Sequence, residues 1–235
     1  MTAIIFDIDG TLTNTTQVDD KCFIQAFKST FGIDISSYNW SSFKDVTDLG
    51  ISEAIIYKNW RRKPSKKELK KLEGNFIQLL KNELVKDKTQ FNEIKGARAF
   101  IDRLIKRNDT LVGIASGAWE RSATLKLNAI GIEPSEFAFS NSSRFQRREA
   151  FLTDTISQLF KMTHKPIDKI IYFGDGTWDF LTCLKLRIEF IGIDPAENGK
   201  LKKIGVKTIF KDYSQAELIY AQIECSSNTE IGMNP

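Results

Sequence analysis

The sequence predicts an α/β fold, in which a doubly wound parallel sheet carries an inserted α-helical cap. Two observations predict this class. Short apolar runs alternate with helical patterns along most of the chain, as is typical of strands buried on both faces of a parallel sheet. The alternation stops from residue 14 to residue 91, where only helical patterns occur. We therefore expect an α/β core formed by residues 1–13 and 92–235, and a helical cap formed by residues 14–91.

The expected elements follow from local patterns in order along the chain. Apolar runs predict strands at 2–8, 110–115, 136–140, 169–173, 189–193 and 207–210. Apolar residues at helical spacing predict core helices at 96–106, 119–129, 149–160 and 178–186, and cap helices at 20–31, 52–60 and 65–86. Asp20 is the expected N-cap of the first cap helix. The polar residues 226–235 are expected to be frayed.

The composition is that of a soluble globular protein. The chain has 235 residues, of which 41% are hydrophobic and 27% charged. No apolar run approaches the ~20 residues of a membrane helix, and the first residues lack the basic region of a signal peptide. The three cysteines form no CxxC pair, which argues against a zinc site or a disulfide scaffold. A cytoplasmic location with no membrane partner is expected.

The net charge of +4 is unevenly distributed. Between Lys58 and Lys88, eleven Lys or Arg residues stand against four Asp or Glu residues, whereas the rest of the chain has 23 basic and 26 acidic residues. No nucleic-acid-binding module and no GxxxxGK loop surrounds this basic segment, so we expect no nucleic-acid partner. A solvated helix face is the favoured interpretation. A field that draws an anionic substrate toward the cleft is the alternative.

Acidic side chains follow two of the expected strands, and open α/β sheets bind ligands at the carboxyl ends of their strands. Asp7 and Asp9 follow the first strand, and two close carboxylates repel unless a cation or a proton lies between them. Asp175 and Asp179 frame a glycine-bearing turn after the fourth expected strand. Such hard oxygen ligands suit Mg²⁺. Helix N-cap and first-turn acids are the plainer interpretation of the second pair.

Ser116 and Gly117 end the second expected strand and lead into a helix. A hydroxyl and free amides at a helix N-terminus can hold a phosphate. An ordinary N-cap serine is the alternative.

Three motifs together resemble the haloacid dehalogenase-like (HAD) hydrolase superfamily, whose core is Rossmann-like. DIDGT at 7–11 matches the DxDGT signature, IASG at 114–117 matches the second motif, and GDGTWD at 174–179 matches the GDxxxD fourth motif. Residues 14–91 stand where the family has its helical cap. The layout is similar to that of the phosphoglycolate phosphatase-like branch.

The resemblance implies a role for each matching residue. Asp7 would be the nucleophile that becomes an aspartyl phosphate, and Asp9 would protonate the leaving oxygen and later accept a proton from water. Mg²⁺ would be held by Asp7, the Asp9 backbone carbonyl and Asp175, with Asp179 nearby. Dehalogenases lack an acid at the position of Asp9, so its presence favours phosphoryl chemistry.

The third motif departs from the family pattern, which usually has a lysine at the start of the helix before the fourth strand. Arg148, directly before the expected helix, is the candidate for a catalytic and phosphate-binding cation, together with Ser116 and Gly117. A guanidinium can bridge a phosphate and a carboxylate. Arg147 and Arg144 remain alternatives.

The expected function is therefore a Mg²⁺-dependent phosphatase that hydrolyses a small phosphorylated metabolite. A sugar phosphomutase on the same scaffold, similar to beta-phosphoglucomutase, is the alternative. A receiver-type phosphorylation switch would be shorter and would lack the helical insert. A ligand-binding protein without catalysis is disfavoured because Asp7, Asp9 and Asp175 are all present.

Aromatic residues and cysteines are interpreted mainly as packing residues. Trp178 is expected in the core, with a place beside the substrate pocket as the alternative. Trp119 is expected nearer the site because it follows Ser116 and Gly117. Trp40 is expected to pack within the cap. Cys22 and Cys183 occupy apolar helix positions and are expected to be buried.

Overall fold

A parallel sheet of six strands forms the centre of the computed structural model, which describes residues 1–225; the tail that was expected to fray, residues 226–235, lies outside them. The strand order is β3-β2-β1-β4-β5-β6, and every neighbouring pair is parallel. The strands are β1 (Thr2–Phe6), β2 (Thr110–Ser116), β3 (Ala138–Asn141), β4 (Lys169–Gly174), β5 (Glu189–Ile193) and β6 (Ile209–Phe210). The predicted α/β class is confirmed.

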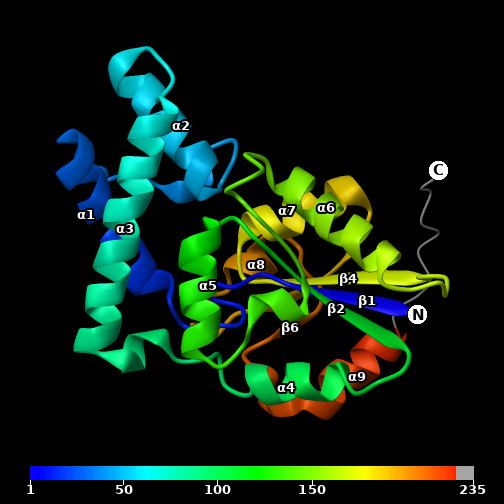
Figure 1. Ribbon diagram of the computed structural model, residues 1–235. Coiled ribbons are helices and arrows are strands. Elements are labelled where there is room, and N and C mark those ends of the chain that lie inside the picture. The colour runs from blue at the N-terminus through cyan, green and yellow to red at the C-terminus, as the bar shows by residue number, and fades with distance from the viewer. Residues whose placement is uncertain (226–235) are drawn as a thin grey trace.

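Helices cover both faces of this sheet (Figure 1). Residues Ile4 and Phe6 of β1 pack in one apolar cluster with α4 (Ala97–Leu104), α5 (Glu120–Ala129) and α9 (Ala216–Cys225). Residues Ala3 and Ile5 pack in another with α6 (Arg148–Lys161) and α7 (Thr177–Leu186), where Cys183 is buried as expected. Alternate residues of β1 thus face opposite layers, as the period of a strand requires. Among residues 1–225, no helix has the length and hydropathy needed to cross a membrane.

Three helices stand to one side of the sheet: α1 (Thr16–Phe31), α2 (Asp48–Trp60) and α3 (Lys66–Lys86) (Figure 1). They bury an apolar cluster of their own, which includes Phe23, Phe27 and Phe76. Trp119, at the start of α5, joins this cluster from the core side. We propose that residues 14–91 form the cap domain.

The start of α2 is hydrogen-bonded to the end of β2 and the loop before α6. The Asp48 amide donates to the Gly117 carbonyl at 2.8 Å, and the Trp119 amide donates to the Asp48 carboxylate at 2.8 Å. The Thr47 hydroxyl donates to the Gln146 carbonyl at 2.7 Å. These bonds close the cap over the carboxyl end of β2.

The expectation that Asp20 caps the first cap helix is wrong. Helix α1 begins at Thr16, and the Asp19 amide already donates to the Thr15 carbonyl at 2.9 Å. The Asp20 carboxylate instead accepts a hydrogen bond from Trp40 Nε1 at 3.0 Å. Asp19 and Asp20 near the start of α1 therefore line a cavity, and Asp20 does not cap the helix.

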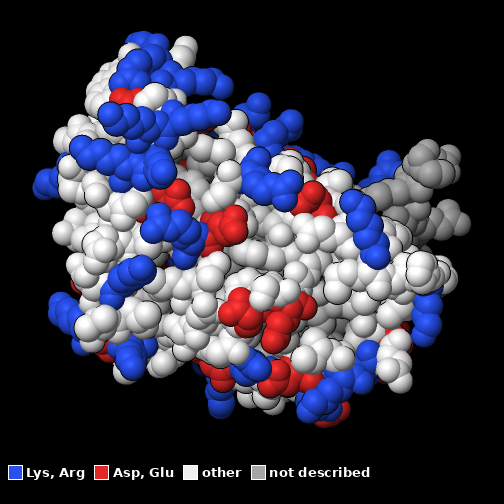
Figure 2. Space-filling model, in the orientation of Figure 1, with Lys and Arg blue, Asp and Glu red and all other residues white. Residues whose placement is uncertain are grey.

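The basic segment 58–88 faces water. All eleven of its Lys and Arg side chains are exposed, and Figure 2 shows basic side chains gathered over α2 and α3. None of them belongs to the described residues that line the cavity beside Asp7. This placement agrees with the solvated helix face favoured by the sequence.

Candidate active site

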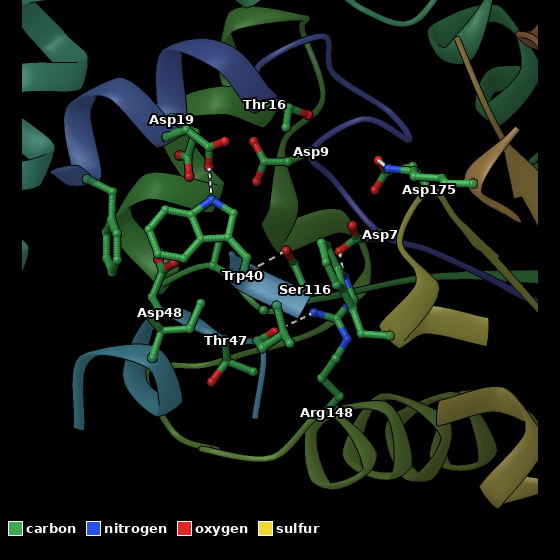
Figure 3. A pocket seen from close by; sticks show the side chains of 18 residues that line it. Asp7, Asp9, Thr16, Asp19, Trp40, Thr47, Asp48, Ser116, Arg148 and Asp175 are labelled. Atoms are coloured by element: carbon green, nitrogen blue, oxygen red, sulfur yellow. Dashed lines mark hydrogen bonds and ion pairs between the residues drawn. The ribbon is translucent and has the colours of Figure 1, made fainter. Parts of the chain in front are cut away.

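A cavity of about 140 Å³ lies where the carboxyl ends of β1, β2 and β4 meet the cap (Figure 3). All but one of the residues predicted for the site line it, and the exception, Asp179, is fully buried beside it. The lining from the core is Asp7, Asp9, Ser116, Gly117, Ala118, Arg148, Asp175, Trp178 and Lys200; the lining from the cap is Thr16, Asp19, Asp20, Phe23, Trp40, Val46, Thr47, Asp48 and Ile51.

Three buried carboxylates meet at one point of this cavity. Asp7, Asp175 and Asp179 each offer an oxygen atom, and these oxygens lie within 4.8 Å of one another. Burial, followed by repulsion from Asp179, raises the pKa of Asp7 well above its ordinary value. Burial also raises the pKa of Asp175 to about 6, although Lys200 opposes the shift. A divalent cation among these hard oxygens would relieve both penalties, so the three residues fit Mg²⁺.

The Asp9 carboxylate does not belong to this group of three. Both of its oxygens accept hydrogen bonds from Lys126 Nζ, at 2.8 and 2.7 Å, and one also accepts from the Thr15 hydroxyl at 2.5 Å. The side chain points toward Asp19 in Figure 3. This orientation separates the two aspartates of the DIDGT motif: Asp7 lies beside Asp175 and Asp179, whereas Asp9 faces the cap.

Arg148 is the one of the three candidate arginines that the structure places at the cavity. It is the first residue of α6 and is buried, whereas Arg144 and Arg147 are exposed. Its guanidinium forms a buried ion pair with Asp179 and lies 3.7 Å from the Asp7 carboxylate. It also donates to the Val46 carbonyl of the cap at 3.0 Å.

Ser116 and Gly117 form the wall between β2 and α5. The Ser116 hydroxyl is buried, lines the cavity, and accepts a hydrogen bond from the Ala118 amide at 3.3 Å. A Cβ atom on Gly117 would lie 2.6 Å from Nη1 of Arg148. The absence of a side chain at this position therefore allows Arg148 to approach the cavity.

Two further cations at the site were not predicted from the sequence. Lys200 Nζ lies 2.8 Å from the Asp175 carboxylate. Lys200 is the first residue of the short helix α8 (Lys200–Lys203), and the sequence does not distinguish it from the other lysines of that helix. Lys126 is completely buried in α5. Lys126 comes three residues after the buried Ala123, on the apolar face of the helix, and this spacing could have indicated that its side chain is buried.

Trp178 lines the cavity, so the prediction of core packing is wrong. Trp40 packs against the apolar cluster of the cap, as expected, and it also lines the cavity. Trp119 is buried beneath the cap, and its ring centroid lies 5.8 Å from that of Phe23 and 6.0 Å from that of Phe76. Its contact with the cavity lining is the hydrogen bond that its backbone amide donates to the Asp48 carboxylate.

Replacing Gly10 by alanine is expected to disturb the site. Gly10 has φ +78°, and a Cβ atom there would lie 2.5 Å from Cγ of Asp175. Gly32 at the end of α1 has φ +70° and open space around it, so Gly32→Ala is the matched control. Both variants should lose about 1 kcal/mol of stability from the left-handed backbone. We propose that Asp175 is an Mg²⁺ ligand, so only Gly10→Ala should also weaken Mg²⁺ binding, measured by calorimetric titration. Equal affinities in the two variants would contradict this proposal.

A parallel sheet that gathers carboxylates and a buried arginine at the carboxyl ends of its strands has the crevice in which open α/β proteins bind their ligands. The chain belongs to the haloacid dehalogenase-like hydrolase family, whose model matches residues 4–193. The protein is thus an enzyme of this hydrolase family, as the three motifs predicted.

Solved structures share the fold at low sequence identity. A hydrolase from Pseudomonas syringae is 18% identical, with a TM-score of 0.73 over 97% of this chain and 100% of that chain. A beta-phosphoglucomutase from Clostridium difficile is 18% identical, with a TM-score of 0.69 over 94% and 96%. A predicted phosphoglycolate phosphatase from Haemophilus somnus is 16% identical, with a TM-score of 0.63 over 93% and 97%. Among curated proteins, the comparison found no significant match.

Proposed function

We propose that this hydrolase is a Mg²⁺-dependent phosphatase that acts on small phosphorylated metabolites through an aspartyl phosphate on Asp7. One observation carries the proposal: the buried Asp7 carboxylate lies beside the carboxylates of Asp175 and Asp179 and 3.7 Å from the Arg148 guanidinium. An anionic nucleophile in such a place can approach an anionic phosphoryl group only where fixed positive charge surrounds it. The family match and the phosphatase named among the structural neighbours agree with this chemistry.

Each protein residue would perform one part of the reaction. An Asp7 carboxylate oxygen forms a bond to phosphorus while the bond from phosphorus to the leaving oxygen breaks. Asp9 gives its proton to that leaving oxygen, and the product alcohol departs. Asp9 then takes a proton from water as the water oxygen attacks the phosphorus of the aspartyl phosphate. This step releases phosphate and restores the Asp7 carboxylate.

Arg148 and Ser116 would hold the phosphoryl oxygens, since both line the cavity next to Asp7. The carboxylates of Asp7, Asp175 and Asp179 and the backbone carbonyl of Asp9 would hold Mg²⁺. When bound, the ion supplies positive charge that offsets the repulsion between nucleophile and substrate.

The charges on the cap side of the cavity favour hydrolysis over mutase chemistry. Asp19, Asp20 and Asp48 are the charged side chains that the cap contributes to the described lining. The charge of Asp19 is paired with Lys126. A sugar phosphomutase must hold a second phosphoryl group at the far end of its substrate, and the carboxylates of Asp20 and Asp48 would repel it. The cap therefore favours a leaving group without negative charge.

A panel of substrates tests both the reaction and this selectivity. We expect phosphate release from p-nitrophenyl phosphate and from glycerol 2-phosphate in the presence of Mg²⁺, and its loss with EDTA. Phosphoglycolate, which carries a second anion, should have a kcat/KM at least about tenfold below that of glycerol 2-phosphate. Conversion of a sugar 1-phosphate to its 6-phosphate without phosphate release would support the mutase instead.

The selectivity should depend on pH in a definite direction. Burial raises the pKa of Asp20 to about 6 and that of Asp48 to about 7. Both residues therefore gain negative charge between pH 6 and pH 8, and the preference for the neutral leaving group should increase over that range. Asp20→Asn should reduce the preference, whereas Asp34→Asn, at an exposed position of the cap, should leave it unchanged. A preference for phosphoglycolate would contradict the assigned role of the cap carboxylates.

A further inference from the structure

Lys126 is a buried cation that the proposed reaction has not yet used. Its side chain is 0% exposed. It belongs to α5, whose other side chains pack against the core and the cap. Burying an ammonium group is costly unless each of its donors has an acceptor. A lysine in such a position therefore needs partners that are themselves fixed.

The partners of Lys126 come from both parts of the molecule. Nζ donates to both carboxylate oxygens of Asp9, at 2.8 and 2.7 Å, and forms an ion pair with Asp19 at 2.5 Å. Two of these contacts are hydrogen bonds to Asp9, and the third is an ion pair with Asp19. Burial opposes the charge on Lys126, but Asp19, Asp9 and Asp48 outweigh it and hold the pKa of Lys126 well above its ordinary value. The lysine is thus a fixed positive charge.

These contacts determine where the Asp9 carboxylate lies. Lys126 binds both of its oxygens, and the Thr15 hydroxyl binds one of them from the start of the cap. Thr15, which binds Asp9, and Asp19, which pairs with Lys126, belong to one helical turn because the Asp19 amide donates to the Thr15 carbonyl. The core helix α5 and the first turn of α1 therefore hold Asp9 between them.

We propose that Lys126 is a positioning residue for the reaction, which orients the Asp9 carboxylate toward the leaving group and links that orientation to the docked cap through Asp19. This inference rests on the proposed phosphatase function, in which Asp9 is the acid and base. Lys126 touches neither the phosphoryl group nor Asp7 and acts only through Asp9.

The test compares two substrates that differ in their need for an acid. The nitrophenolate of p-nitrophenyl phosphate leaves without a proton, whereas the alkoxide of glycerol 2-phosphate must receive one. Asp9 also acts in the second step, which is common to both substrates, so the test measures the first step as release of the leaving group in a rapidly quenched single turnover. Lys126→Met should lower that rate for glycerol 2-phosphate by about 10²-fold, within the range typical of lost general acid catalysis, and for p-nitrophenyl phosphate by less than about fivefold. Asp9→Asn should give the same unequal pattern. Lys126→Arg, which keeps the charge, should recover part of the selective loss.

A second variant covers the case in which Lys126→Met does not fold. In Lys126→Met/Asp19→Asn, the loss of the ammonium charge is accompanied by the loss of one carboxylate charge, and the unequal loss between the two substrates should persist. An equal loss for both substrates, or no loss, would overturn the role of Lys126 while the phosphatase proposal stands. Failure of the unaltered enzyme to release phosphate from either substrate would overturn the phosphatase proposal and the role of Lys126 with it.

Discussion

Asp7→Asn is expected to abolish phosphate release, with kcat falling by at least about 10³-fold, because loss of a nucleophile removes the covalent step on which the remaining residues depend. The amide has nearly the same shape as the carboxylate but carries no anionic oxygen to attack phosphorus. Phosphate release by the purified variant, with saturating Mg²⁺, is the measurement. Mass spectrometry of acid-quenched protein should detect the aspartyl phosphate in the unaltered enzyme and not in the variant.

The stability of Asp7→Asn distinguishes lost chemistry from lost folding. Burial and the neighbouring carboxylates raise the pKa of Asp7, so the ionised residue opposes folding at neutral pH. The neutral amide removes that penalty, and Tm should stay the same or rise in the absence of Mg²⁺. The penalty grows as pH rises through the range in which Asp7 ionises, so the advantage of the variant should grow in the same direction. Unchanged turnover would contradict the role of Asp7 as nucleophile.

Arg148→Ala is expected to have the second largest effect, because it acts on both catalysis and stability. The loss of a donor aimed at the phosphoryl group should lower kcat/KM by about 10²- to 10³-fold. It also leaves the fully buried Asp179 without its ionic partner, and breaking such a pair costs about 3–5 kcal/mol. Phosphate release and urea denaturation measure the two effects separately.

Arg147→Ala is the matched control for this prediction. Arg147 is adjacent in the sequence but exposed, so its removal should change neither activity nor stability appreciably. Arg148→Lys keeps the positive charge but not the planar guanidinium, and it should give intermediate values for both quantities. A large loss in Arg147→Ala together with normal activity in Arg148→Ala would contradict the assignment of the third motif.

The strand and motif positions were predictable because they depend on local sequence. The run TAIIF is apolar enough to be buried on both faces, and it forms β1 with the aspartates directly after it. Arg148 was the first candidate because the resemblance places a cation at the start of this helix, but the sequence left Arg147 and Arg144 open. Parallel pairing then brings Asp7 and Asp175 to the same edge of the sheet, a relation that follows from the fold class alone.

The cap side of the cavity was not predictable in the same way. Asp19 and Asp48 reach it only because α1 and α2 dock on the core, and no spacing in the sequence encodes that docking. Asp20 resembled an N-cap because acidic residues are common at helix starts, whereas tertiary contacts decided its place. Lys126 was missed for the opposite reason, since a lysine in a helix is usually solvated.

The strand order has a consequence for the newly made chain. Thr2 of β1 pairs with Thr110 of β2 and with Lys169 of β4, so both partners of this central strand are synthesised long after it. The helices of residues 14–91 can begin to form before those partners are synthesised, because the hydrogen bonds within a helix are local. Until then the segment TAIIF remains an unpaired apolar strand, the kind of segment that associates with other chains. A chain that stops within the cap would leave that strand permanently exposed, so incomplete translation products are expected to aggregate.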